Sequence, residues 1–246
     1  MHFLDGCFHY LTSMANWTGS DGIAARAVAQ VELSALVVLA AALIGIGIGF
    51  YLGHVGHGGF VAVNAANAAR AIPSLALLIL LVIWPVVSLK GGGFDAAFLT
   101  LVALAIPPVL TNAYVAMREV DPVVIEAAKS VGMSSARRFF TIEIPLAAPL
   151  TVAGLRTAAV EVVATSTLAA YVSYNDLGNF IFAGLNTNNN VESFCGAFLV
   201  AVLSGIADLC LLGLYRLVTP KPLRRATAAR SRGTFGVHGR LSRVAA

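Results

Sequence analysis

The sequence predicts an all-α protein that crosses a membrane several times. Only 11% of its 246 residues are Asp, Glu, Lys or Arg, whereas soluble domains carry about 25%. Hydrophobic residues make up 58% of the chain, and several uncharged runs reach the length of about 18 residues that a helix needs to cross a bilayer. A helix satisfies its own backbone hydrogen bonds in lipid, so each run is expected to cross as a helix.

Five helical spans are expected from these runs. In chain order they are Leu33–Leu52, Ala71–Leu89, Ala96–Met117, Ala147–Tyr171 and Cys195–Tyr215. The first three contain no charged residue. The fourth contains Arg156 and Glu161, and the fifth contains Asp208. Gly45 and Gly49 have the four-residue spacing that lets two membrane helices approach closely, so tight packing is expected in the first span.

The connection between the third and fourth spans, residues 118–143, is too polar to lie in lipid. It carries eight charged residues: Arg118, Glu119, Asp121, Glu126, Lys129, Arg137, Arg138 and Glu143. At about 3 kcal/mol for each charge at the bilayer centre, burying them would cost about 24 kcal/mol. Lys and Arg favour the cytoplasmic side, and residues 216–243 add eight more basic residues without an acid. Both segments are therefore expected in the cytoplasm, with the N-terminus outside.

Three segments follow from this topology. Residues 1–30 are expected to form an amphipathic segment at the outer face, 31–216 the membrane domain, and 217–246 a basic cytoplasmic tail. The first segment lacks the basic start and apolar run of a signal peptide, so cleavage is not expected. The three cysteines are odd in number and far apart, and His54 with His57 has no third ligand nearby, so we expect no disulfide framework and no metal site.

The polar connection is expected to fold as two short amphipathic helices joined by a glycine turn. Asp121 is the expected N-cap of the first helix, and Gly132 stands where a left-handed residue ends it. Ser134 or Ser135 can cap the second helix, which Pro145 is expected to stop as the next span begins. A plain solvated loop is the simpler alternative, but apolar faces on two capped helices favour a partner.

The string "EAAKSVGMSSARRFFTIEIP", Glu126–Pro145, resembles the EAA loop of binding-protein-dependent ABC importer permeases, with Ile where the family usually has Leu. Four further stretches look like the quaternary-amine, or osmoprotectant, branch of that family: Asn67–Pro85, Asn112–Ala128, Leu155–Val172 and Asp208–Arg225. The resemblance covers about residues 30–225. It implies a type I transmembrane domain, one pore-forming subunit of an importer for compounds such as glycine betaine, carnitine or choline.

The resemblance also implies partners and coupling residues. The partners are cytoplasmic ATPase subunits, a second permease copy or a sister permease, an extracytoplasmic substrate-binding protein and the lipid bilayer. The implied coupling residues are Glu126, Ala127, Ala128, Gly132, Arg137 and Pro145. A helix-turn-helix that binds nucleic acid is disfavoured, because both ends of the loop run directly into membrane spans.

The chain has no nucleotide site of its own by sequence. A phosphate loop requires glycine directly before Lys-Ser or Lys-Thr, but of the three lysines only Lys129 precedes Ser, and Ala128 precedes Lys129. ATP is therefore expected to bind a partner chain, and no cofactor is expected here. Catalysis is not expected either, because no histidine lies in any predicted span to serve as a base.

Ionisable groups in the spans leave a second class of function open, a secondary transporter driven by an ion gradient. The chain shows no inverted repeat, which disfavours that class. For Asp208 a pairing role between helices is expected rather than a relay. Glu161 either lines the pore or pairs with Arg156, although a spacing of five is poor geometry on a helix. An amino-acid importer permease is a further alternative.

The substrate path is expected to involve aromatic rings. A quaternary ammonium ion has no hydrogen to donate and is held by ring faces, at about 0.5–2 kcal/mol for each contact. The candidates are Trp84, Tyr114, Tyr171 and Tyr174, together with Glu161. Trp and Tyr at span ends are also common interface anchors. The segment Ser173–Asp176 departs from the glycine-rich pattern of the family, so the outer gate is expected to differ.

Overall fold

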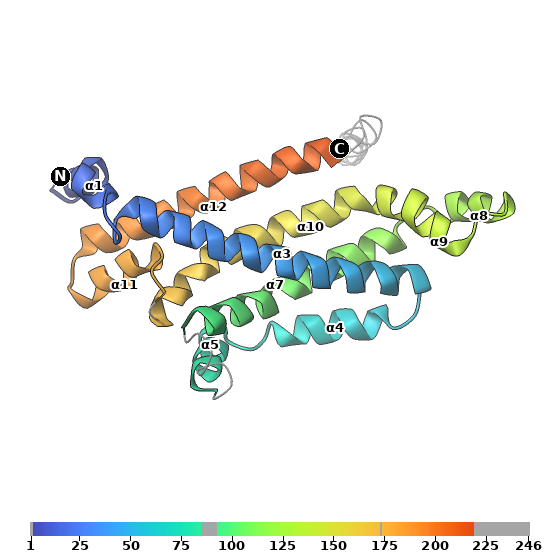
Figure 1. The fold of residues 1–246 in the computed structure, drawn as a ribbon, viewed down its shortest axis with the longest axis horizontal. Helices are drawn as coiled ribbons and strands as arrows, with labels where there is room; N and C mark the ends of the chain where they lie inside the picture. The colour runs from blue at the N-terminus through green and yellow to red at the C-terminus, as the bar shows by residue number, and fades with distance from the viewer. Residues whose placement is uncertain (1, 85–92, 173, 219–246) are drawn as a thin grey trace, which may run out of the picture.

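The computed structural model describes residues 2–84, 93–172 and 174–218, and every regular element in these ranges is a helix (Figure 1). The helices are α1 (His2–Thr12), α2 (Met14–Trp17), α3 (Ile23–Val55), α4 (Gly59–Ala69), α5 (Ser74–Ile83), α7 (Gly93–Arg118), α8 (Pro122–Ser130), α9 (Ser135–Arg138), a π-helical turn η1 (Phe139–Glu143), α10 (Ile144–Thr165), a 3-10 helix η2 (Ser166–Val172), α11 (Gly178–Asn186) and α12 (Asn190–Val218). The predicted all-α class is confirmed.

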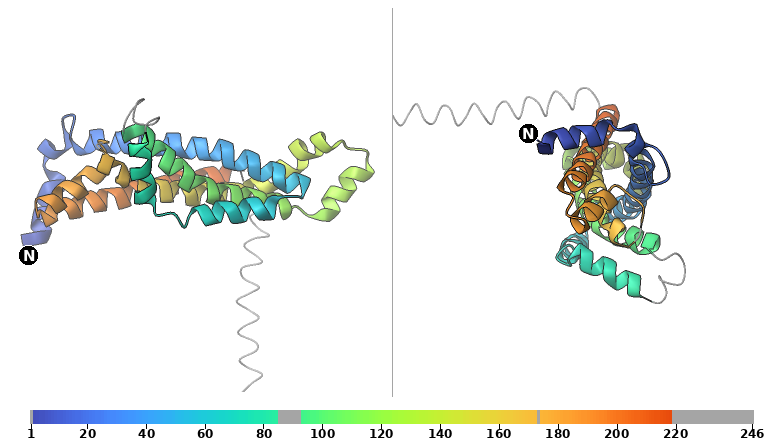
Figure 2. Two further views of the ribbon diagram at one scale, coloured as in Figure 1. Left: turned by 90° about the horizontal axis from the view of Figure 1, so that it is seen from below. Right: turned by 90° about the vertical axis from the view of Figure 1, so that its left-hand side faces the viewer.

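Within the described residues, four helical stretches are long and apolar enough to cross a membrane: α3, α7, the run from α9 through η2, and α12. They lie side by side along one long axis (Figures 1 and 2). A fifth span is present if the bent pair α4 and α5 crosses together. The expectation of about five spans is therefore confirmed, and each long helix contains one of the predicted runs.

The second predicted span, Ala71–Leu89, is wrong as a single straight helix. The chain instead breaks between α4 and α5, whose axes meet at 83°, and α5 runs across the long axis in Figure 2. Pro73 explains the break, because proline lacks an amide hydrogen and keeps the preceding Ile72 out of the helical region. The ten residues of α5 reach only about 15 Å, half a bilayer core. Residues 85–89 of this predicted span, and Lys90 after it, lie outside the described residues.

The centre of the molecule is the α3–α7 pair. Gly45 and Gly49 face α7 so closely that an added Cβ would lie 2.9 Å from the Val109 side chain and 2.7 Å from the Leu110 carbonyl oxygen, respectively. Gly53, one turn further, meets Met117 in the same way. The expected close packing is confirmed, and glycine is required because the backbones themselves are in contact.

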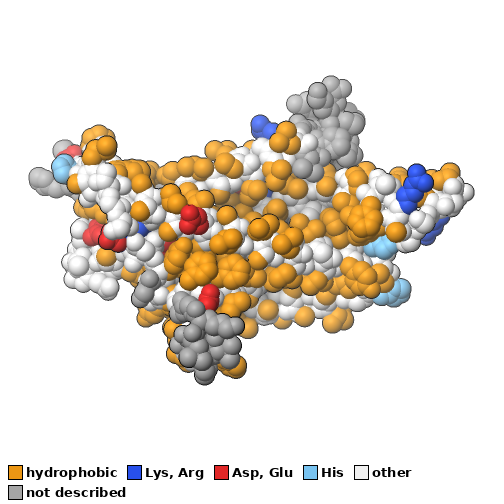
Figure 3. Space-filling view, in the orientation of Figure 1, with side chains coloured by type: hydrophobic (Ala, Val, Ile, Leu, Met, Phe, Trp, Pro, Cys, Tyr) orange, Lys and Arg blue, Asp and Glu red, His pale blue; other side chains and the backbone are white. Residues whose placement is uncertain are grey.

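At the other extreme, α12 is almost uncovered. Of its most apolar stretch only 6% of residues are buried, and large side chains such as Leu209 and Ile206 are exposed. Cys210 is also exposed on this helix, whereas Cys7 and Cys195 are buried where α1 meets the start of α12. In Figure 3 hydrophobic side chains cover the length of the molecule between its two ends, as expected for a surface in lipid.

Candidate coupling loop and membrane path

The α8–α9 loop projects beyond the bundle at the end opposite α1 (Figures 1 and 2). Its turns form as the sequence predicts. The Asp121 carboxylate accepts a hydrogen bond from the Val123 amide at 2.8 Å, and Ser134 Oγ accepts one from the Arg137 amide at 3.4 Å. Between the helices Gly132 has φ 76°, a left-handed conformation that favours glycine. The predicted helix–glycine–helix is therefore confirmed.

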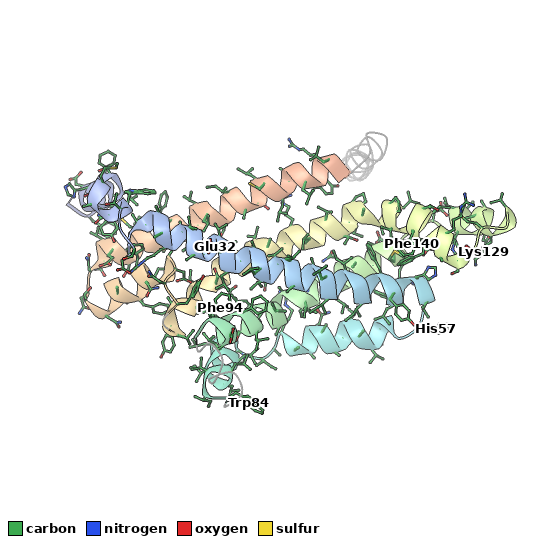
Figure 4. All side chains as sticks on the ribbon, in the orientation of Figure 1. Glu32, His57, Trp84, Phe94, Lys129 and Phe140 are labelled. Atoms are coloured by element: carbon green, nitrogen blue, oxygen red, sulfur yellow. The ribbon has the colours of Figure 1, made fainter. Side chains whose placement is uncertain are left out.

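The loop has an inner and an outer side. Ala128 is buried, and Ile125 packs on the cluster of buried residues below the loop. Glu126 and Ala127, adjacent to Ala128 in sequence, are exposed instead. Figure 4 shows Lys129 and Phe140 pointing away from the bundle, and Figure 3 shows basic side chains gathered at this end. The outer side thus offers both charge and apolar surface, the latter from Val123, Val131 and Phe140.

Pro145 does not stop a helix, contrary to the prediction. The chain continues from α9 through η1 into α10, and Pro145 is an exposed residue in the first turn of α10. The reason is the π-helical turn before it, in which the Ile144 amide donates to the carbonyl of Phe139, five residues earlier. A wider turn accommodates the proline ring, and proline is tolerated in a first turn because its missing amide hydrogen has no required partner there.

Glu143 is the member of the eight predicted cytoplasmic charges that the structure places inside the protein, with 3% of its surface exposed. Its carboxylate accepts from Arg138 Nε at 2.6 Å and lies 2.5 Å from His54 Nδ1. His54 Nε2 lies 2.8 Å from Ser135 Oγ. The histidine at the end of α3 therefore contacts both the π-helical turn and α9. Sequence reasoning missed this contact, because 89 positions separate His54 from Glu143.

The charged residues of the spans are paired across helices. Arg156 of α10 and Asp208 of α12 form a two-pronged ion pair, in which Nη2 donates to Oδ2 at 2.6 Å. This agrees with the pairing role expected for Asp208. Glu161 does not pair with Arg156. Its partner is Arg70, at 2.9 Å, which the α4–α5 bend brings against α10.

Between α10 and α12 lies an open groove of about 750 Å³. Its lining residues are Ala153, Arg156, Thr157, Val160, Glu161, Ala164, Asp208 and Tyr215. Glu161 is thus the predicted path residue that this groove contains. Charged side chains are costly where they face hydrocarbon. The charged lining of this groove therefore suits an aqueous path between membrane helices.

The four predicted path aromatics do not converge. Tyr114 packs its ring over Gly59, and Tyr174 donates from its hydroxyl to the Ala29 carbonyl at 3.0 Å. Tyr171 faces Phe182 with 5.8 Å between ring centroids. Trp84 is exposed at the edge of the molecule (Figure 4).

Sequence reasoning missed an aromatic row at the base of α7. Phe94 stacks on Phe98 at 6.2 Å and lies 5.7 Å from Tyr174. Phe residues carry no polar group that would have marked them, and in sequence they read as ordinary parts of an apolar run. Their grouping depends on Tyr174, which follows them by about eighty positions in the chain and becomes a neighbour only in the fold.

The connection between η2 and α11 is fixed to α3 by buried polar groups. Gln30 donates to the Val163 carbonyl at 2.9 Å and accepts from the Leu177 amide at 3.3 Å. Asp176 is fully buried and accepts from the Gly178 amide at 2.9 Å. Burial raises the pKa of Asp176 to about 7, although the Gly178 hydrogen bond and the nearby Arg26 charge oppose the rise. Ser173 of the divergent segment lies outside the described residues.

The fold and this loop define a class, a polytopic α-helical membrane protein with a helix–glycine–helix at one end of its bundle. The model of the family "Binding-protein-dependent transport system inner membrane component" matches residues 33–224, and the chain belongs to this family.

Curated relatives include permeases of small organic cations and zwitterions. The chain is 33% identical over 139 residues to the choline transport system permease protein OpuBB of Bacillus subtilis (strain 168), covering 56% of this chain and 64% of that protein. It is 34% identical over 138 residues to the glycine betaine/carnitine/choline transport system permease protein OpuCB of the same organism, with the same coverage. The carnitine transport permease protein OpuCB of Listeria monocytogenes is 34% identical over 141 residues, with 57% and 65% covered. The matched stretch is thus just under two thirds of each relative.

Solved structures show the same fold at low sequence identity. An inward-facing form of the MetNI methionine ABC transporter superposes with a TM-score of 0.70 at 20% identity, covering 80% of this chain and 96% of that chain. An amino acid ABC transporter solved with histidines gives a TM-score of 0.59 at 21% identity, covering 77% and 89%. The fold is therefore that of an ABC importer transmembrane domain.

Proposed function

We propose that this chain is the membrane-spanning permease subunit of an ATP-driven importer for quaternary-amine osmoprotectants such as glycine betaine, carnitine or choline. The observation that carries the proposal is the α8–α9 loop, which is capped, turned at Gly132 and held outside the bundle with its outer side uncovered. An amphipathic helix pair with such a surface suits docking in a groove of a partner protein. The substrate class rests on the names of the relatives.

The topology and partners follow from the two ends of the molecule. The α8–α9 end is proposed to face the cytoplasm and two ATPase subunits, which bind the ATP. The end with α1 and α11 faces outward, toward a substrate-binding protein, so that the N-terminus is outside and the tail 217–246 is cytoplasmic; residues 219–246 of that tail lie outside the described residues. The chain needs no cofactor, metal or nucleic acid of its own in this scheme. A second copy or a sister permease completes the path, because the groove beside α12 is open.

The proposed coupling residues divide the work of the loop. Glu126, Ala127 and Arg137 are exposed and available to the ATPase, whereas Ala128 holds α8 to the bundle. Gly132 sets the angle between the two helices, and Pro145 lies where the loop passes into α10. Closure of the ATPase on ATP would then tilt α10 through this continuous connection, and the spans would alternate between inward-open and outward-open states.

The proposed path follows the groove of α10. Glu161 with Arg70, and Arg156 with Asp208, place two balanced ion pairs along it, five residues apart on α10. Because each ion pair has no net charge, it attracts a charged or zwitterionic substrate only weakly, and the substrate can pass without binding tightly. Trp84 and Tyr171, whose rings are exposed, are proposed to meet substrate near the outer end. The contacts of Tyr114 and Tyr174 favour a packing role for these two.

A secondary transporter is the main alternative, and the ion pairs weigh against it. A relay carboxyl must be free to bind and release a proton or ion, but Glu161 and Asp208 are each held in an ion pair with an arginine. The second alternative is an amino-acid importer permease, which shares the loop and the ATP dependence and differs only in the compound carried.

The test is uptake by proteoliposomes that hold ATP inside and no ion gradient, with the ATPase and the binding protein that co-purify with the chain. We expect uptake of radiolabelled glycine betaine, carnitine or choline that Gly132→Val abolishes. Gly19→Val is the matched control, since Gly19 also has a positive φ, 95°, and open space around it, but lies at the other end. Activity that requires a gradient, ignores Gly132 and disappears in Glu161→Gln would instead establish the carrier. Uptake of amino acids alone would establish the second alternative.

A further inference from the structure

A buried polar cluster lies between the α8–α9 loop and the end of α3. Its centre is the Glu143 carboxylate, which Arg138 and His54 contact from two sides, while the other nitrogen of the His54 ring meets Ser135. Only 4% of the Glu143 side chain is exposed, against 13% for Arg138 and 18% for His54. A carboxylate at this depth requires charged or hydrogen-bonding partners, and here both of its oxygens have one.

The position of the cluster in the fold allows it to transmit motion from the α8–α9 loop to α3. α10 follows α9 and η1 directly in the chain, so its start moves with the loop through the backbone. α3 has no such link, because it ends at Val55 and continues into α4. Its end is fixed instead to α7, where Gly53 packs against Met117. At its other end the loop joins α7 through residues 119–121, so of α3, α7 and α10 it is α3 that the loop can move only through side chains.

Two kinds of side-chain contact are available there. Phe139 packs on the His54 ring at 4.9 Å, and the cluster of Phe50, Met117 and Ile125 lies beneath. These apolar contacts are non-directional and allow sliding. The carboxylate bonds are directional, and they hold the π-helical turn at a fixed angle to α3. A π-helical turn is a place where a helix bends easily, so this is the point at which a motion of the loop would otherwise be absorbed.

We propose that Glu143, with His54 and Arg138, is a positioning residue that clamps the coupling loop to α3, so that the loop and the α3–α7 pair move as one body during transport. This inference rests on the proposed function, because coupling has meaning only if an ATPase drives the loop. Removal of the clamp leaves the loop docked and the ATPase active, but the motion is lost in the π-helical turn.

The experiment measures uptake and ATP hydrolysis on the same proteoliposomes, with the complex purified through this chain. Glu143→Gln, which keeps the shape and removes the charge, should leave hydrolysis nearly unchanged and reduce uptake per ATP by about tenfold, as expected for loss of one charged hydrogen-bond network. His54→Gln should have the same effect, and the double variant should be no worse than the stronger single one. The controls are Glu119→Gln and His57→Gln, which alter exposed neighbours of the same type.

A second measurement follows hydrogen exchange of residues 122–138 in the purified chain in lipid nanodiscs, where no ATPase is needed. Glu143→Gln should speed exchange in this segment and leave α7 unchanged, which also shows that the variant is folded. Unchanged exchange, unchanged coupling, or a parallel loss of uptake and hydrolysis would each overturn the clamp. If the wild-type complex itself shows no ATP-driven uptake, the proposed function fails, and the exchange data still decide whether Glu143 holds the loop.

Discussion

The α3–α7 pair and α12 represent two ways of placing an apolar helix in a membrane. In the most apolar stretch of α7 56% of residues are buried inside this chain, whereas in α12 only 6% are. α3 and α7 meet backbone to backbone along a line of glycines, and their fit is decided by steric exclusion. On α12, by contrast, large side chains such as Ile206 and Leu209 are exposed, although the helix packs along α10 and α11 on one side. The apolar surface of α3 and α7 is covered by this chain itself, whereas the exposed apolar surface of α12 must be covered by lipid or by another chain.

The two regions also differ in how they use polar groups. Gln30 and Ser34 are buried where α3 meets α10, and each has a hydrogen-bond partner. The polar contact of α12 in the groove, the Arg156–Asp208 pair, is about one third exposed. A solvent-exposed ion pair contributes little to stability, so this pair connects α12 to α10 without fixing its position rigidly. The comparison therefore predicts a rigid scaffold beside a helix that can move.

The largest expected effect is at the glycine line. Gly49→Val should destabilise the purified chain by about 3 kcal/mol or more, because the new Cβ alone would lie 2.7 Å from the Leu110 carbonyl oxygen and overpacking has costs of this size. The measurement is the melting temperature in detergent, followed by fluorescence size-exclusion chromatography. Gly47→Val is the matched control, since Gly47 lies on the same helix with open space around it. Equal melting temperatures for the two variants would contradict the steric account.

The next effect concerns the connection between η2 and α11, whose buried polar groups hold the α11–α12 hairpin to α3. Asp176 has a pKa of about 7 in the folded chain against an ordinary 3.8, and a raised carboxyl pKa means that the folded state binds the proton more tightly. Its contribution to stability is then complete below about pH 4 and is lost as the pH rises through 7, and the part lost between pH 5 and pH 8 is on the order of 2.5 kcal/mol. Stability measured from pH 5 to pH 8 should fall in the wild type.

Asp176→Asn tests the cause of that fall. Asparagine keeps an acceptor for the Gly178 amide but cannot ionise, so the variant should show a flat profile and exceed the wild type in stability at pH 8. Asp5→Asn, which alters an exposed acid of α1, should leave the slope unchanged. A slope that persists in Asp176→Asn would contradict the assignment of the pH dependence to Asp176.

The smallest effect is expected on α12, and it decides what covers that helix. Leu209→Ala should lower the free energy of unfolding of the isolated chain by less than about 0.5 kcal/mol, because the residue is 66% exposed. Its melting temperature should therefore hardly change. Leu33→Ala, at a fully buried position of α3, should cost about 2–5 kcal/mol. If Leu209→Ala weakens the assembled transporter but not the single chain, a second permease covers α12. An equal absence of effect in both would indicate lipid.

Local patterns carried the predictions that succeeded. The long apolar runs gave the spans, and Gly132 with its neighbouring caps gave the turn, because each of these depends on nearby residues alone. The four-residue spacing of Gly45 and Gly49 predicted close packing for the same reason. Confirmed features such as these need no knowledge of which helix lies opposite.

The predictions that failed depended on partners far away in the chain. Glu161 pairs with Arg70, 91 positions before it, because the chain bends sharply between α4 and α5. Pro73 marks a break in the sequence, but it does not show which helix the bend brings Arg70 against. Glu143 was expected to be an exposed loop charge, but in the fold it is buried against His54. Pro145 was expected to end a helix because its effect depends on the hydrogen bonds of the preceding turn, which sequence does not show.

Cys210 gives this molecule a reporter that needs no engineering. It is the exposed one of the three native thiols, and it lines a second, apolar cavity of about 470 Å³ between α3, α10 and α12, while Cys7 and Cys195 are buried at the other end. A spin label or fluorophore added to the unmodified chain should therefore attach at this one position. The mobility of this label during transport would show whether α12 lies against lipid or against another chain.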